Sequence, residues 1–168
     1  MKSKNNYLVL ACLLLSGVTF AQQKGKIGLS GSIQGSQYGI SVPIWVSQKV
    51  VVAPAFELKF GESIGTDFGI GLESRFYLKT DKICPYYGFK LGAAFNIPSS
   101  DNSTDTETKI DGVAGIAFGA EYFFVENFSV GVEAQGNVTK SGKDSERYGN
   151  PGGINFNTAT MISASIYF

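Results

Sequence analysis

Hydrophobic and polar residues alternate with a period of two along almost the whole chain beyond its N-terminal segment. In residues 127–139, Val130 and Val132 fall on one face, while Glu133 and Gln135 fall on the other. Successive side chains of a β-strand point to opposite sides, whereas a helix would repeat about every 3.6 residues. The pattern therefore predicts strands with one apolar and one polar face.

Eight such strands are predicted, separated by clusters of Gly, Ser, Asn and Asp that favour turns. They cover residues 24–34, 37–46, 50–60, 66–79, 83–97, 110–124, 127–139 and 154–168. The connections after the second, fourth and sixth strands are short, and those after the fifth and seventh are long and polar. This alternation is typical of a membrane barrel with both chain ends at the short-turn side.

Two prolines fall inside predicted strands. Pro43 and Pro54 would lie almost opposite each other in the hairpin formed by the second and third strands. Proline cannot donate a hydrogen bond to its neighbour strand and belongs at edges or bulges. We therefore expect a local bulge there, or shorter strands.

The polarity of the two faces predicts which of them points inward. The apolar faces carry no charge, and one Lys or Arg at mid-depth in a bilayer would cost about 2–4 kcal/mol. The polar faces mix charged residues with Gly, Ala and Ser, which suits a narrow lumen. The fold class predicted is an all-β, eight-stranded antiparallel transmembrane up-and-down β-barrel. The alternative is a soluble lipocalin-like carrier, which is apolar inside.

The charged residues of the polar faces are the candidate site. Lys79 lies on the same face near the end of its strand. The predicted hairpins place Glu73 opposite Lys90, and Lys59 opposite Asp67. An eight-stranded barrel is just wide enough for its own side chains, which favours a static plug over a polar gate or narrow conduction path. The members of this lumen charge network are Lys26, Glu57, Lys59, Asp67, Glu73, Arg75, Lys90, Asp111, Glu121 and Glu133.

Composition excludes several classes of function. The chain has 14 basic and 14 acidic residues and no His. A nucleic-acid binder would need a basic excess, and Ser-His-Asp catalysis or a His-ligated metal would need histidine. We therefore predict no enzyme activity, and no catalytic, cofactor or metal site.

The N-terminal segment reads as a secretory signal peptide covering residues 1–21. A short basic start precedes an apolar run, and Thr19 and Ala21 are small residues before the expected cleavage point. The barrel domain would then be residues 22–168. Cys12 follows a sequence that loosely resembles a lipoprotein box, but the apolar run continues past it, which favours simple cleavage.

Aromatic residues gather at the short-turn ends of the strands, and those that point outward are candidates for an interfacial girdle. They are Trp45, Phe76, Tyr77, Tyr86, Tyr87, Tyr122, Phe123, Phe124, Phe128, Tyr167 and Phe168.

The last strand carries alternating apolar residues and a terminal aromatic residue: Ile162, Ala164, Ile166 and Phe168. This ending looks like the assembly signal of bacterial outer-membrane barrels. With the signal peptide and the strand count, the mature chain resembles the small OmpA/OmpX-like, porin-family outer-membrane proteins. The resemblance implies a Gram-negative outer membrane, contact with its lipid, and insertion by the barrel assembly machinery. It implies no particular activity, because one fold hosts many functions.

Three functions remain open on this basis. The first is a monomeric, non-enzymatic outer-membrane barrel that supports the envelope or binds or adheres through residues 98–109 and 140–153. The second is a narrow porin-like channel for ions or small solutes. The third is the soluble carrier. No residue pattern identifies a surface partner of the loops.

Overall fold

The protein is built from β-strands alone in the part of the chain described by its computed structural model, residues 27–61, 65–97, 108–145 and 149–168. No helix in these ranges is long and apolar enough to cross a membrane. The strands are β1 (Gly28–Gln34), β2 (Gln37–Ser41), β3 (Ile44–Ser47), β4 (Val50–Gly61), β5 (Gly65–Tyr77), β6 (Ile83–Ile97), β7 (Lys109–Val125), β8 (Phe128–Lys140) and β9 (Ile154–Tyr167).

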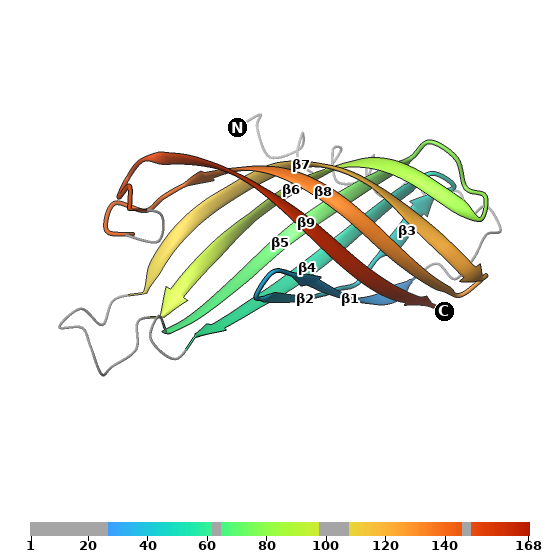
Figure 1. Cartoon of the computed structure of the whole chain (residues 1–168), viewed down its shortest axis with the longest axis horizontal. Helices are drawn as coiled ribbons and strands as arrows, with labels where there is room; N and C mark the ends of the chain where they lie inside the picture. The colour runs from blue at the N-terminus through green and yellow to red at the C-terminus, as the bar shows by residue number, and fades with distance from the viewer. Residues whose placement is uncertain (1–26, 62–64, 98–107, 146–148) are drawn as a thin grey trace, which may run out of the picture.

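The strands form one closed antiparallel sheet. Its order is β2-β1-β9-β8-β7-β6-β5-β4-β3, and β2 also pairs with β4. Because β2 and β3 both pair with β4, they are two halves of one barrel strand, and the barrel has eight strands. Figure 1 shows the long strands crossing obliquely, with the turns after β3, β5 and β7 at the right. The predicted fold class is confirmed.

The break between β2 and β3 lies at the two prolines. Ser41 pairs with Ala55 and Ile44 pairs with Val52, so Pro43 falls in the gap. The Val42 amide still donates to the Pro54 carbonyl at 2.9 Å. The amide position and carbonyl of one strand residue point to the same side, so the donor that Pro54 lacks also faces the gap. β4 thus stays continuous and the third predicted strand is not shortened, whereas the second is interrupted between Ser41 and Ile44.

Side chains alternate between the lumen and the outside, except at irregularities near the short turns at Trp45–Ser47 and Phe123–Val125. On β7, Ile116 and Phe118 are more than half exposed, whereas Asp111 and Glu121 are each 1% exposed. Every other strand also presents large apolar side chains on the outside. The barrel is therefore apolar outside and polar inside, as the charge pattern predicts.

One predicted lumen residue is misplaced. β5 ends at Tyr77, and the last cross-strand bond at this end is donated by the Leu78 amide. Lys79 therefore lies in the turn, with its side chain 56% exposed and 3.9 Å from Asp81. Its assignment to the polar inner face is wrong because the chain leaves the barrel wall before it.

Candidate functional site: the barrel lumen

Aromatic side chains close the short-turn end of the lumen. Four of them are at most 4% exposed, and a fifth, Trp45, packs against them. Trp45 stacks on Tyr77 with ring centroids 4.8 Å apart. We call this set the aromatic layer; its members are Trp45, Tyr77, Tyr86, Phe123 and Tyr167.

The sequence pattern predicts a girdle of aromatics at the short-turn end and does not predict the aromatic layer inside the lumen, although the positions of two of its members indicate an inward orientation. Tyr77 lies two residues after Arg75, and Phe123 two residues after Glu121, so each shares the inward face with a charged residue. Only the outward members of the short-turn aromatics can form a girdle. These are Phe76, Tyr87, Tyr122, Phe124, Phe128 and Phe168.

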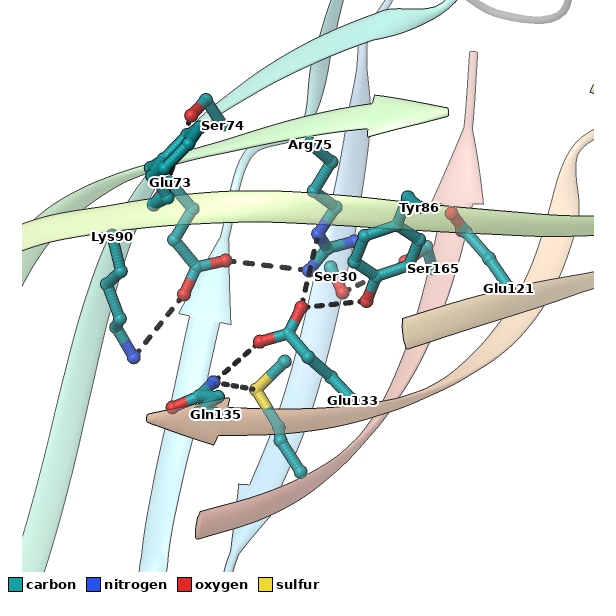
Figure 2. A network of polar contacts seen from close by, with 12 residues as sticks. Ser30, Glu73, Ser74, Arg75, Tyr86, Lys90, Glu121, Glu133, Gln135 and Ser165 are labelled. Atoms are coloured by element: carbon teal, nitrogen blue, oxygen red, sulfur yellow. Dashed lines mark hydrogen bonds and ion pairs between the residues drawn. The ribbon is translucent and has the colours of Figure 1, made fainter. Parts of the chain in front are cut away.

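Arg75 stands at the centre of the polar network, next to the aromatic layer. Its side chain is 3% exposed. Its Nη2 lies 3.5 Å from Oε2 of Glu73, and its Nε lies 3.9 Å from Oε2 of Glu133. The guanidinium also lies over the Tyr86 ring, 5.3 Å from its centroid. Figure 2 shows these groups converging from β5, β6 and β8.

Lys90 extends the network towards the long-loop side. Its Nζ is 2.5 Å from Oε1 of Glu57 and 3.5 Å from Oε1 of Glu73. The predicted pairing of Glu73 with Lys90 is confirmed in the strand register as well. Gln37 donates from Nε2 to the other oxygen of Glu57 at 2.5 Å. Glu73 thus links the two cations into one chain of contacts across the lumen.

Glu121 is held in a different way. This carboxylate is 1% exposed and accepts hydrogen bonds from three hydroxyls, those of Tyr77, Ser129 and Tyr167. The Tyr167 bond is 2.9 Å long. A buried charge is tolerable when several donors satisfy it. Because the donors come from β5, β8 and β9, Glu121 on β7 connects the C-terminal strand β9 with strands on either side of β7.

The remaining predicted residues lie towards the long-loop end. Asp111 accepts from the Gly142 amide at 2.9 Å and from the Ser145 hydroxyl at 3.1 Å, which fastens the start of the last loop to β7. Asp67 accepts from Asn96 at 2.5 Å and pairs in register with Lys59, as predicted.

The central network thus joins Glu57, Glu73, Arg75, Lys90 and Glu133, whereas Lys59, Asp67 and Asp111 lie nearer the long-loop end of their strands. Lys26 lies outside the described residues, as do the predicted signal peptide and much of the loop at 98–109.

The charges in the lumen compensate one another only in part. Of the predicted lumen residues that the structure describes, six are acidic and only Lys59, Arg75 and Lys90 are basic. Neutral donors supply the difference: hydroxyls at Glu121, amides at Glu57 and Asp67, and a backbone N–H at Asp111. Glu133 accepts hydrogen bonds from a hydroxyl and from an amide: Tyr86 donates to it at 2.7 Å and Gln135 at 2.6 Å.

The long-loop half of the lumen is more open. A small cavity of about 80 Å³, partly open to solvent, lies beyond the contact between Lys90 and Glu57. Its wall combines amides such as Gln34 and Asn137 with glycines such as Gly69. The described residues contain no group of three or more Asp, Glu, Cys or His side chains that could hold a metal ion.

The Glu121 contacts yield a testable prediction. Glu121→Leu leaves three buried hydroxyls without their acceptor, and each unsatisfied group costs about 1–3 kcal/mol. We expect the free energy of unfolding, measured by urea titration in lipid vesicles, to fall by several kcal/mol, and by less for Glu121→Gln, which keeps one acceptor oxygen. The control is Glu126→Leu in an exposed turn, which should stay within about 0.5 kcal/mol of the wild type. Equal stability of Glu121→Leu and this control would contradict the assignment.

Comparisons with known proteins identify the fold. No family model matches the chain, and no curated protein matches it. The N-terminal β-barrel domain of Pseudomonas aeruginosa OprF is similar in structure, with a TM-score of 0.64, 17% identity, and coverage of 87% of this chain and 100% of that domain. Neisserial surface protein A (NspA) has a TM-score of 0.60, 12% identity, and coverage of 84% and 93%. Both are OmpA-like outer-membrane barrels, and this chain has their fold.

Proposed function

We propose that this chain is an integral outer-membrane barrel without enzyme activity, whose closed lumen stabilises the wall and whose long loops face the cell exterior. The observation that carries the proposal is the inverted polarity: ionised groups are buried inside, while large apolar side chains cover the outside. The fold shared with the two outer-membrane barrels supports the same location. The proposed role is envelope support or the display of loops for binding or adhesion.

The outer surface fits hydrocarbon better than water. Leu72, Leu91 and Phe118 lie in the middle of three adjoining strands and are 51%, 67% and 63% exposed. Soluble monomers rarely expose a contiguous apolar patch larger than a few hundred Å². A soluble carrier would also need an apolar pocket inside, whereas the described lumen combines charged groups and amides with a packed aromatic layer. The geometry therefore disfavours the carrier alternative.

The proposed insertion involves the barrel assembly machinery acting on the last strand. On β9, Ile162 and Ile166 are 58% and 48% exposed, and Phe168 directly after the strand is 78% exposed. Ala164 lies between the two isoleucines on the same outward face. This row is accessible on one side of the barrel, which supports its proposed role as an assembly signal.

Location and orientation are tested on intact cells. We expect the protein to fractionate with the outer membrane, and a protease added from outside to cleave within residues 98–109 or 140–153. Cleavage within the short turn at residues 80–82 would show that the barrel is inserted the other way round. Recovery in the soluble periplasmic fraction would contradict the proposal as a whole.

A narrow channel is the second candidate function, and the cavity on the long-loop side favours it. The cavity reaches the contact between Lys90 and Glu57. Beyond that point side chains alone close the lumen. We favour the closed state because Arg75 and Tyr86 are each 3% exposed and contact each other at the junction of the polar network and the aromatic layer.

Planar-bilayer recordings separate the two candidates. We expect wild-type protein to give no reproducible unitary steps, and the double variant Arg75→Ser/Tyr86→Ser to give small steps that select for cations, because acidic groups then dominate the lumen. Lys79→Ser, in an exposed turn, is the matched control and should behave as the wild type. Steady wild-type steps as large as those of the double variant would favour the channel.

A further inference from the structure

We propose that the outside of the barrel carries a binding site for one acyl chain of a phosphorylated glycolipid of the lipid A type, in the leaflet at the long-loop end. The site is a groove on the outer faces of β6 to β9, which we call the outer groove. The inference rests on the proposed outer-membrane location with the long loops facing outward. The walls of the outer groove include Phe89, Ile116 and Phe156, and its floor includes Ala114, Gly136 and Thr158.

The strand register explains why the surface is hollow there. Ile116 pairs with Gly136, and Gly136 pairs with Thr158, so two small residues follow one large residue in this row. Ala114 on β7 adds a third small residue in the next row. Phe156 is 81% exposed and stands up beside them. The small residues thus lie at the base of a depression bounded by protruding apolar side chains.

The floor of the groove has room for atoms of another molecule. A Cβ atom built on Gly136 would meet only the Cγ1 atom of Ile116, at 3.7 Å, which is an ordinary contact. Lipid tails are as apolar as the groove itself, so a bound chain gains mainly by close packing against the fixed wall. Packing alone would hold many kinds of acyl chain, and the selectivity must come from the headgroup.

Lys140 supplies that selectivity. It follows the groove residue Val138 by two positions on β8 and therefore lies on the same outward face, about 7 Å further towards the long-loop end. Its Nζ is 2.5 Å from the Gly152 carbonyl, which holds the ammonium on the long-loop side of the groove. An ammonium at this position can contact a phosphate whose acyl chain lies in the groove.

The height of the groove fits the edge of the membrane. Ten residues of β7 separate the outward aromatic Phe124 from Ala114, which is about 34 Å along the strand. With a strand tilt of about 40°, the rise is about 26 Å, close to the height of the apolar band of such barrels. Since Phe124 marks the short-turn boundary, the groove lies just inside the opposite boundary and Lys140 lies at it.

Native mass spectrometry of the refolded barrel, incubated in detergent with diphosphoryl lipid A or with phosphatidylethanolamine, tests the site. We expect the wild type to retain one lipid A molecule, and Gly136→Leu, which fills the groove, to lower retention at least tenfold. The matched control is Gly31→Leu, because Gly31 is also exposed on the outside and its Cβ would meet nothing within 4 Å. Lys140→Gln should lower retention of lipid A, which carries two phosphate monoesters, several-fold, and lower retention of phosphatidylethanolamine, whose single phosphodiester is balanced by an ammonium group, by a smaller factor.

Other outcomes of the lipid-retention experiment would contradict particular parts of the proposal. Equal retention of lipid A by the wild type and Gly136→Leu, or equal loss in Gly31→Leu, would overturn the groove as a site. Retention of both lipids to the same extent in every variant would overturn the role of Lys140. A dimer in place of the lipid adduct would assign the groove to a second copy of the chain.

If the wild type shows no heat-modifiable shift in gel mobility, the proposed membrane barrel fails. If it shows the shift but retains no lipid, only the groove fails.

Discussion

Among the described residues, the structure depends on how the lumen stabilises five buried carboxylates, those of Asp67, Glu73, Asp111, Glu121 and Glu133, and the part-buried carboxylate of Glu57. Arg75 and Lys90 supply positive charge to the central ones. A carboxylate taken out of water costs several kcal/mol unless charges or hydrogen-bond donors replace its hydration. The barrel meets this requirement with donors from opposite sides of the lumen: Arg75 from β5 reaches Glu133 on β8, and Tyr77 from β5 reaches Glu121 on β7. Each contact joins strands that are not neighbours in the sheet. The polar interior therefore holds the closed wall in shape.

The interior contacts also account for the closed lumen. Arg75 must lie between Glu73 and Glu133 to stabilise both carboxylates, and in that position it rests on the Tyr86 ring. The same arrangement leaves the long-loop half of the lumen to smaller residues and amides, where the cavity lies. Stability and occlusion thus arise from one set of contacts, in which the apolar outer face takes no part.

The alternation of apolar and polar residues with a period of two, together with residue positions counted from each turn, predicts much of this fold. The eight strands, the inward face of each, and the pairings of Glu73 with Lys90 and Lys59 with Asp67 follow from positions counted on either side of a turn. Contacts beyond the nearest neighbour strand could not be predicted in this way. The 2.5 Å contact of Lys90 with Glu57 spans β6 to β4, and the reach of Arg75 to Glu133 crosses the lumen; both depend on strand tilt and on the closure of the sheet.

The aromatic layer shows another limit of the sequence pattern. Tyr77 and Tyr167 lie on the same strand face as charged or small residues that point inward. Aromatic side chains at strand ends, however, suit both a girdle and a lumen. Their hydroxyl contacts with Glu121 decide the matter, because each tyrosine then buries its ring and satisfies a carboxylate. The outer groove depends in the same way on the register of three strands, which no single strand reveals.

The inverted polarity of the wall is tested most directly by fluorescence quenching with lipids brominated on their acyl chains. Trp45 is the single tryptophan of the chain and belongs to the aromatic layer inside the barrel, so its emission in vesicles should be quenched weakly. A tryptophan introduced by Leu72→Trp in a Trp45→Phe background should be quenched strongly, because Leu72 faces outward at mid-strand. Strong quenching of Trp45 together with weak quenching at position 72 would contradict the account.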